Sequence, residues 1–271
     1  MPELPEVETS VLAIRYKIIN KKINNIIIRE RKLREPVSDD LNLLITEKIV
    51  DIKRRGKYII IFTTGDHEVI IHLGMSGSLT LVSNNSEIIK HSHVDIVLDN
   101  KIIRFNDPRK FGMVMYSKNH KNNKYIKNCG VEPFDKRFIE NDYLFNIGHN
   151  KKTNIKNFIM QNKIIVGVGN IYASETLFDA KINPNSLTCD LSISDYKRLS
   201  ISIVKVLENS IKNKGTTLKD HKIGENETGN NQFSLNVYSQ KSCKICKDGI
   251  IQTKHNSRTT YFCNSCQILI K

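Results

Sequence analysis

The sequence lacks the features of a membrane protein or an exported protein. It contains no run of about 18 apolar residues, so we expect no transmembrane helix. Its first eight residues, Met1-Pro2-Glu3-Leu4-Pro5-Glu6-Val7-Glu8, are acidic and include two prolines, whereas a signal peptide begins with a basic segment followed by an apolar one. We therefore expect a cytoplasmic protein that does not bind membranes.

Composition bounds the class of protein more loosely. The 271 residues suggest two domains with a small appendage, and the 39% apolar and 26% charged residues are typical of a globular chain. The net charge is +14, from 42 Lys and Arg against 28 Asp and Glu. A general abundance of lysine and a polyanionic partner such as nucleic acid explain this excess equally well, so the net charge alone does not identify a binding partner.

Cysteine is scarce, and four of the six cysteines form a pattern. Cys243 and Cys246 are separated by two residues, and so are Cys263 and Cys266. Two such pairs at this distance are typical of a zinc site, and four thiolates leave no open coordination position, which indicates structural zinc. Without a secretion signal, two disulfides are the weaker interpretation. We expect the remaining cysteines, Cys129 and Cys189, to be buried as small apolar residues.

The segment between the two cysteine pairs predicts a short hairpin. Residues 250–254 and 259–262 have the composition of strands, and residues 255–258 lie at the turn between them. A hairpin of this size buries too little apolar surface to fold alone, so we expect zinc to stabilise it. Arg258 then lies on a stiff, projecting turn.

Periodicity predicts an α+β fold. Pro5 opens a helix that runs to about Tyr16 or Ile19, and its apolar residues recur at helical spacing. Seven short strands follow, which indicates a β-sandwich or flattened barrel, with one helix capped by Ser38 among them. After about Pro133 the pattern becomes helical. The predicted strands cover residues 26–28, 58–62, 69–73, 79–82, 94–98, 102–105 and 113–116, and the clearest later helices cover residues 152–162, 171–180 and 194–213.

The N-terminal Met1-Pro2-Glu3 permits amine chemistry. Methionine before proline is normally removed, which would make Pro2 the terminal residue, and an α-amino group titrates near about 7.7–8.0. An unprotonated secondary amine can attack a sugar carbon and form an iminium, and a neighbouring carboxylic acid can donate a proton. On the tripeptide alone, an ordinary chain start is the more frequent explanation. Lys57, in the basic segment Lys53-Arg54-Arg55-Gly56-Lys57, would lower the pKa of that amine if it lay nearby.

Three glycine-containing segments are candidate DNA contacts. His72-Leu73-Gly74-Met75-Ser76-Gly77 presents Met75, and Asp107-Pro108-Arg109-Lys110-Phe111-Gly112 presents Arg109 and Phe111. Exposed Met and Phe can wedge between base steps, although both residue types are normally part of a core. Val166-Gly167-Val168-Gly169-Asn170 lies between two helices, with Asn170 as the predicted N-cap, and such a helix start can bind phosphate or simply pack.

Together these segments resemble formamidopyrimidine-DNA glycosylase (8-oxoguanine DNA glycosylase/AP lyase), over essentially the whole chain. Five parts of the sequence carry the resemblance: the N-terminal eight residues, Gly56-Lys57-Tyr58, the three glycine-containing segments, Gly215 to Asp220, and the four-cysteine module. It implies an N-terminal β-sandwich catalytic domain over residues 1–133, a helical helix–two-turns–helix domain over residues 134–236, and a zinc finger over residues 237–271.

The resemblance also implies roles for individual residues. Pro2 attacks the sugar C1′ and forms a Schiff base, and Glu3 donates a proton during base excision. Lys57 and Arg258 are the proton donors for β- and δ-elimination. The implied DNA contacts are His91, Arg109, Lys151 and Asn170, and Met75, Arg109 and Phe111 fill the gap left by the flipped base. The implied partner is double-stranded DNA with oxidised bases or abasic sites, bound by a monomer that holds one zinc ion.

Two alternatives remain at this stage. An endonuclease VIII-type glycosylase would prefer oxidised pyrimidines, but Leu4 and the set of Met75, Arg109 and Phe111 favour purine lesions. A catalytically inactive zinc-ribbon DNA-binding protein would not need the combination of Pro2, Glu3, Lys57 and Arg258. We expect the polar segment 215–236 to be a mobile loop. Its residues 220–235 have few recognisable features and leave the lesion preference open.

Overall fold

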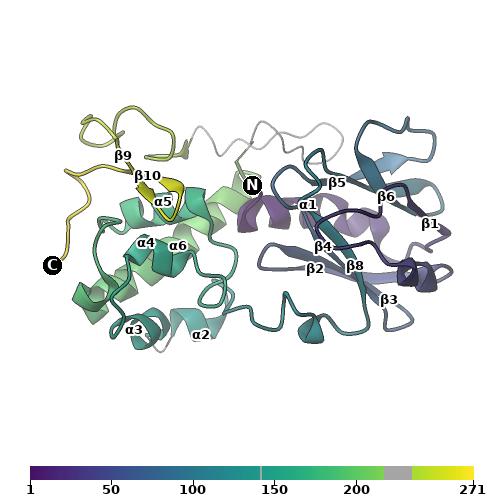
Figure 1. Cartoon of the computed structure of the whole chain (residues 1–271), viewed down its shortest axis with the longest axis horizontal. Coiled ribbons are helices and arrows are strands. Elements are labelled where there is room, and N and C mark those ends of the chain that lie inside the picture. Colours follow the sequence, from purple (N-terminus) through teal and green to yellow (C-terminus); the bar gives the residue numbers. More distant parts are fainter. Residues whose placement is uncertain (141, 217–233) are drawn as a thin grey trace. The chain divides into compact units, whose positions relative to one another are not determined.

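The structure is a computed structural model that describes residues 1–140, 142–216 and 234–271 (Figure 1). Contacts group the chain into two units. Unit 1 comprises Met1–Asn128 with the residues after the last long helix, and unit 2 comprises Cys129–Asn213 with the C-terminal segment. No helix among the described residues combines the length and apolarity needed to cross a membrane. The domain boundaries after residues 133 and 236 stay a prediction, and most of the segment 220–235 lies outside the described residues.

The first helix, α1 (Leu4–Ile18), begins and ends close to the predicted positions. Pro5 lies in its first turn, where its missing N–H costs no helical hydrogen bond. Glu3 and Glu6 form a reciprocal capping box, in which each side chain accepts a hydrogen bond from the other residue's backbone N–H. The apolar stripe predicted from the sequence is buried in the core of unit 1 and comprises Val7, Val11, Ile14 and Ile18.

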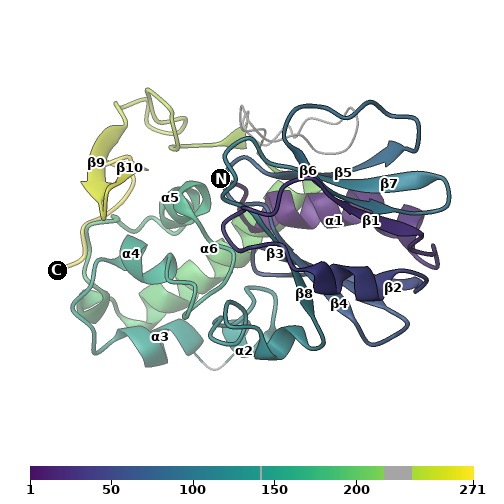
Figure 2. The same ribbon diagram turned by 45° about the vertical axis from the view of Figure 1, so that its right-hand side comes forward.

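Unit 1 is a β-sandwich, which confirms the predicted class of fold. Two antiparallel four-stranded sheets have the strand orders β1-β6-β7-β5 and β2-β3-β4-β8. Figure 2 shows them as two layers, and a single apolar core joins residues of both sheets and of α1. The strands are β1 (Asn25–Ile28), β2 (Ile49–Arg55), β3 (Tyr58–Thr63), β4 (Glu68–His72), β5 (Ser78–Ser83), β6 (Ser92–Val97), β7 (Lys101–Asn106) and β8 (Met113–Ser117).

Strand β2 is absent from the sequence-based prediction. A register shift between Ile49 and Asp51 bulges the strand, so the buried residues Ile49 and Ile52 lie three positions apart instead of two. The bulge therefore removes the alternation by which a strand is recognised. The helix predicted after Ser38 is a short 3-10 helix, η1 (Asp39–Leu44), and a second one, η2 (His120–Asn122), follows β8.

Unit 2 is helical, as predicted for the region after Pro133. Its helices are α2 (Lys136–Ile139), α3 (Tyr143–Gly148), α4 (Ile155–Ile159), α5 (Asn170–Asp179), η3 (Thr188–Asp190) and α6 (Ile193–Lys212). Helix α4 is shorter than the predicted 152–162, because the Asn154 side chain accepts hydrogen bonds from the N–H groups of Lys156 and Asn157 and starts the helix there. A hairpin of β9 (Ile251–His255) and β10 (Arg258–Phe262) completes the unit.

Two expectations about single residues are wrong. Cys129 and Cys189 are only partly buried, because Cys129 lies in a loop and Cys189 lies in the short 3-10 helix η3. Asn170 is the first residue of α5, and Gly169 is its N-cap. The glycine occupies the cap without contributing a side-chain hydrogen bond, which leaves the Asn170 side chain available for other contacts.

A buried ion pair joins strands β6 and β7. The Asp95 carboxylate is fully buried and accepts hydrogen bonds from Arg104 Nε at 3.0 Å, Arg104 Nη2 at 2.9 Å and Arg29 Nη2 at 2.8 Å. Burial opposes ionisation of Asp95, but the hydrogen bonds from Arg104 and Arg29 outweigh it and lower the pKa of this carboxyl group.

We predict that Arg104→Met lowers the free energy of unfolding by about 3–5 kcal/mol, because it leaves a buried carboxylate with only one of its two arginine partners. Urea unfolding measures this change. Arg137→Met is the matched control, since its pair with Asp135 is on the surface (the Arg137 side chain is 76% exposed) and should contribute less than about 1 kcal/mol. Equal losses in the two variants would contradict this interpretation.

Candidate functional site

The start of α1 places Pro2 and Glu3 in a buried position. Pro2 is buried, and Glu3 is 2% exposed. The fully buried carboxylate of Glu6 accepts a hydrogen bond from the Glu3 N–H at 2.8 Å and another from the Thr216 N–H at 2.8 Å. Glu6 therefore holds both the residue after Pro2 and the segment after α6, a positioning role that the sequence did not reveal.

Gly215, the residue before Thr216, allows the chain to approach Glu6 this closely. Gly215 has a backbone φ of +72°, and a Cβ atom at this position would lie 3.0 Å from Glu6 Oε1. A side chain here would combine an unfavourable backbone conformation with a close contact to the carboxylate. The Gly-Thr pair at 215–216, which the sequence offers as part of a longer motif, therefore has a structural reason that involves α1.

Lys57 lies at the tip of the hairpin between β2 and β3. Its neighbour Gly56 has a φ of +58°, which suits a two-residue turn. The side chain of Arg54 connects this hairpin to α1, since its Nε donates to Glu8 Oε2 at 2.6 Å and its Nη1 donates to the Gly56 carbonyl at 3.2 Å. Lys57 and the start of α1 are thus held at the same end of unit 1.

His72 lies on the strand next to this hairpin. It pairs with Tyr58 across the sheet, and the two rings lie 4.9 Å apart. Burial, together with the positive charges of Lys57 and Arg34, lowers the pKa of His72 to about 4. The ring is therefore neutral at physiological pH, and its Nδ1 accepts a hydrogen bond from the Gly74 N–H at 3.0 Å. His72 Nε2 then carries the proton and serves as a hydrogen-bond donor.

The fully buried carboxylate of Asp107 joins the two turns that carry Met75, Arg109 and Phe111. Ser76 Oγ donates to Asp107 Oδ1 at 2.6 Å. The N–H of Arg109 donates to the same oxygen at 3.2 Å, and the N–H of Gly112 donates to Oδ2 at 2.7 Å. Asp107 was noted in the sequence only as the first residue of a motif. Its burial identifies it as the residue that fixes both turns.

The two turns pack closely enough to require glycine. A Cβ atom on Gly74, whose φ is +64°, would lie 2.5 Å from the backbone nitrogen of Gly112. Met75 is 39% exposed and Phe111 is 45% exposed, so both apolar side chains lie at the surface.

Arg109 and His91 are attached to the same pair of turns. The Arg109 guanidinium lies over the Phe111 ring, 5.0 Å from its centroid. His91 has a φ of +70°, and its carbonyl accepts a hydrogen bond from the Asp107 N–H at 3.1 Å. The structure therefore gathers four of the predicted DNA-contacting residues around Asp107.

In unit 2, the four cysteines form a compact cluster. The four sulfur atoms lie within 4.8 Å of one another, with Cys243 and Cys266 3.8 Å apart and Cys246 and Cys263 3.3 Å apart. Both separations are too long for a disulfide bond and approach the ~3.8 Å between sulfurs that share a tetrahedral zinc ion. The donor set therefore fits the structural zinc predicted from the sequence.

The surroundings of Cys243 favour ionisation of its thiol. Burial opposes its ionisation, but backbone hydrogen bonds from Cys246 and Ile245 outweigh burial and lower the pKa of this thiol to about 7. The first knuckle closes with the Lys247 N–H donating to the Cys243 carbonyl at 3.0 Å. The backbone hydrogen bond from Asp248 lowers the pKa of Cys246, but hydrogen bonds with the neighbouring thiols outweigh it and raise this pKa to about 12, and burial raises the pKa of Cys266. Because thiolates bind zinc, Cys243 is the cysteine most ready to bind the ion.

Arg258 lies beside the tip of the hairpin rather than at it. The turn residues are Asn256 and Ser257, whose φ values of 46° and 63° match a tight two-residue turn that favours Asn. Arg258 is the first residue of β10, pairs with His255 across the hairpin and is exposed. The strand therefore constrains its backbone and leaves its side chain at the surface.

A buried lysine attaches this hairpin to the helices. Lys156 in α4 is fully buried, and its Nζ donates to Asn170 Oδ1 at 2.7 Å and to Thr260 Oγ1 at 2.7 Å. Asn170 Nδ2 in turn donates to the Thr259 carbonyl at 2.9 Å. Asn170 thus contacts the hairpin instead of capping α5. The sequence offers no signal for Lys156, because lysine is usually the exposed residue of a helix.

A second buried charge holds the segment before the cysteine cluster. Glu175 in α5 is 3% exposed and accepts hydrogen bonds from the N–H groups of Asn236, Val237 and Tyr238 at 2.8–2.9 Å. Lys151, the remaining predicted DNA contact, is exposed in the loop before α4. The predicted residues therefore form one group in unit 1 and another in unit 2.

Two family models match the chain. Residues 1–114 match the formamidopyrimidine-DNA glycosylase N-terminal domain, and residues 129–222 match the formamidopyrimidine-DNA glycosylase H2TH domain. Among curated proteins, formamidopyrimidine-DNA glycosylase of Wolbachia pipientis subsp. Culex pipiens (strain wPip) is 44% identical over 98% of this chain and 100% of its own. The Alteromonas mediterranea protein of the same name is 42% identical, again over 98% and 100% of the two chains.

Solved structures agree with the sequence matches. The complex between Lactococcus lactis Fpg and DNA containing an abasic site aligns with a TM-score of 0.90 at 31% identity, over 98% of this chain and 99% of that one. The MutM (Fpg) protein of Thermus thermophilus aligns with a TM-score of 0.88 at 27% identity, over 98% of each chain. The chain therefore belongs to the formamidopyrimidine-DNA glycosylase family.

Proposed function

We propose that this enzyme excises oxidised purines, 8-oxoguanine and formamidopyrimidines, from duplex DNA and then cleaves the strand. The observation that carries the proposal is the buried, capped start of α1, which holds Pro2 and Glu3 in place in a chain of this family. The solved relatives include Lactococcus lactis Fpg bound to DNA with an abasic site and with a Fapy-dG lesion. We infer that this chain also binds duplex DNA with damaged bases or abasic sites, and that it does so at the nucleoid.

The proposed first step uses the Pro2 amine as the nucleophile. After removal of Met1, its lone pair attacks the sugar C1′, and the bond from C1′ to the base breaks as the base leaves. Glu3, held beside Pro2 by its hydrogen bond to Glu6, donates a proton in this step. The leaving base takes the amine proton, the C1′–O4′ bond of the sugar opens with the proton from Glu3 on O4′, and the product is a charged iminium that links Pro2 to C1′.

Elimination then cleaves the DNA strand on both sides of the sugar. The iminium acidifies the C2′ hydrogen, whose loss expels the 3′ phosphate, and a second elimination expels the 5′ phosphate. We assign Lys57 to the first step and Arg258 to the second as proton donors. The expected product is a one-nucleotide gap with a phosphate at each end.

The remaining predicted residues would bind the DNA. Met75, Arg109 and Phe111 lie on one exposed surface around Asp107 and have the residue types that replace a flipped base in the stack. His91, Lys151 and Asn170 would contact the backbone. In this proposal the cysteine cluster holds one zinc ion that stabilises the hairpin and does not take part in the reaction.

A preference for oxidised pyrimidines is the second candidate. A solved complex of Lactococcus lactis Fpg contains an oxidised pyrimidine in its DNA, with 31% identity to this chain. Initial rates of release of 8-oxoguanine and of an oxidised pyrimidine from matched duplexes distinguish the two candidates.

Borohydride trapping tests the proposed nucleophile. We expect a covalent complex with a duplex that contains 8-oxoguanine opposite cytosine, because borohydride reduces the iminium. A variant that combines Pro2→Gly with an uncleaved N-terminal tag should give none, since its α-amine is displaced from the site. The control is the enzyme with Pro2 unchanged and the same tag at its C-terminus, and it should form the covalent complex in full yield. Undiminished trapping in the N-terminally tagged variant would refute the proposed role of Pro2.

We also predict that Asp107→Asn lowers the rate of 8-oxoguanine excision by at least about tenfold. The amide group would face the Ser76 hydroxyl and the N–H of Gly112, so at least one buried hydrogen bond would be lost and both turns would shift. Single-turnover kinetics measure the effect. The control is Asp66→Asn, an exposed position with a φ of 57° that asparagine tolerates. Equal excision rates in the two variants would show that the hydrogen bonds of Asp107 are not needed for excision.

Zinc removal provides a third test. Cys243→Ser should abolish stoichiometric zinc, weaken DNA binding and slow strand cleavage, because the hairpin with Arg258 loses its support. Metal analysis, fluorescence anisotropy with labelled DNA and cleavage assays measure these effects. Cys189→Ser is the control, since Cys189 lies outside the cluster. Full activity in a zinc-free protein would show that the hairpin does not depend on metal.

A further inference from the structure

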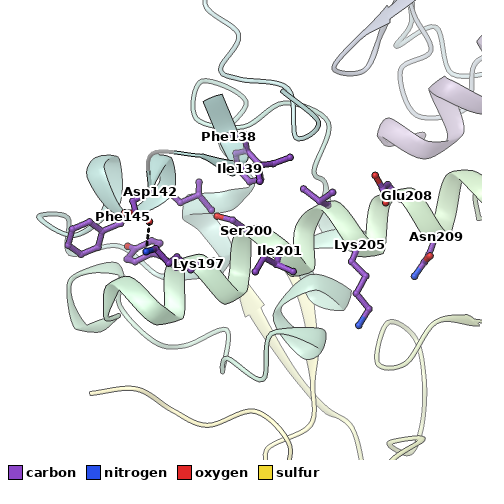
Figure 3. A pocket seen from close by; sticks show the side chains of 13 residues that line it. Phe138, Ile139, Asp142, Phe145, Lys197, Ser200, Ile201, Lys205, Glu208 and Asn209 are labelled. Carbon is purple, nitrogen blue, oxygen red and sulfur yellow. Dashed lines mark ion pairs between the residues drawn. The ribbon is translucent and has the colours of Figure 1, made fainter. Parts of the chain in front are cut away.

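A cavity of ≈ 600 Å³ lies in unit 2, apart from every residue assigned above to DNA binding or catalysis. Helices α2 and α3 form one wall, and α6 forms the other (Figure 3). Sites for small molecules typically measure about 300–1,000 Å³ and are mostly apolar. The cavity therefore has the size of a site for one small organic molecule.

The lining is apolar at the base and at the edge. Phe138, Leu144 and Tyr196 are each 1% exposed, so they form a packed base. At the edge, Ile139 is 53% exposed and Ile201 is 64% exposed, and both side chains line the same cavity. A bound apolar group would remove these two isoleucines from water, which supplies the driving force for binding.

One polar group lies at the base of the cavity. Ser200 is 9% exposed, and its hydroxyl makes no hydrogen bond to another residue in the described parts of the chain. Its side chain leaves α6 on the side that faces α2 and α3 (Figure 3). The hydroxyl is not enclosed on every side, so water or a bound molecule can reach it. Ser200 is therefore available to hydrogen-bond to a bound molecule.

The charges around the cavity are unevenly paired. Lys197 lies 3.5 Å from Asp142, and Lys205 lies 2.7 Å from Asp179. Glu208, by contrast, forms no ion pair with any described residue and is exposed at the other end of the lining (Figure 3). The unpaired charge of the lining is therefore negative, and it lies eight residues, or about 12 Å along α6, from Ser200.

We propose that this cavity binds a small organic cation: a molecule with an aromatic or branched apolar body and one ammonium group. The apolar body packs between Ile139 and Ile201, and the ammonium group lies toward Glu208. The aromatic rings of Phe138, Phe145 and Tyr196 line the same cavity and favour an aromatic body. The proposed site is independent of the glycosylase function.

Three probes with one body and different charges test the proposal on the full chain. They are 4-biphenylmethylamine, which is cationic, 4-biphenylmethanol, which is neutral, and biphenyl-4-carboxylate, which is anionic. A ligand of this size should bind with a Kd of about 1 mM or tighter. We expect the amine to bind most tightly by titration calorimetry and to shift the NMR methyl signals of Ile139 and Ile201. No binding by any of the probes would overturn the site.

Three variants of lining residues and one control separate the contributions of the lining. Glu208→Gln should weaken amine binding by about threefold, as for a partly exposed ion pair, and leave the alcohol unchanged. Glu87→Gln, at an exposed position in unit 1, is the matched control and should bind like the unmodified chain. Ser200→Leu should fill the base of the cavity and weaken every probe by at least about tenfold. Ile201→Ala, at an exposed position that does not endanger folding, should weaken every probe about threefold.

Two sets of results would contradict the proposed site. Equal affinity for the three probes, or no effect of Glu208→Gln on the amine, would overturn the preference for a cation. A dimer that forms at the concentrations used and dissociates on Ile201→Ala would show that a second copy covers the cavity instead. Excision of 8-oxoguanine should be unchanged in all four variants, because none of the altered residues belongs to the proposed DNA site.

Discussion

The hydrogen bonds of the buried Glu6 carboxylate are the interaction on which the proposed chemistry depends. A nucleophile at the end of a chain is intrinsically mobile, because it is tethered on one side only. Glu6 removes this freedom by accepting the Glu3 N–H and the Thr216 N–H, so the residue beside Pro2 is fixed to the helix and to a distant segment. The capping box is thus more than a helix start, since it also places the two residues proposed to react with DNA.

The same device recurs at the proposed DNA-contacting residues. A buried charge with several hydrogen bonds fixes a surface loop, while the side chains that would meet DNA stay exposed. Asp107 does this for the turns of Met75 and Phe111, and Lys156 does it for the hairpin of β9 and β10 through Asn170 and Thr260. Because an unpartnered buried charge is expensive, each network is stable only in one arrangement. We infer that the enzyme presents preorganised contacts rather than forming them on DNA.

The sequence predicted the parts that depend on local patterns. The stripe of α1, the alternation in most strands and the spacing of Cys243, Cys246, Cys263 and Cys266 each reflect a simple geometric rule. Strand β2 was missed because its bulge breaks the alternation. The role of Lys156 was missed because its burial depends on partners from α5 and β10, about 14 and 104 residues away. Asn170 was assigned as a cap on residue type alone, whereas its side chain bonds to the hairpin.

Peptide mapping of the borohydride-trapped complex tests the central claim, that the N-terminal proline is the nucleophile held by the start of α1. The trapped protein would be digested with protease and nuclease, and mass spectrometry would locate the residual sugar. We expect the adduct on Pro2, in a peptide that lacks Met1. An adduct on Lys57 or on another lysine would contradict it.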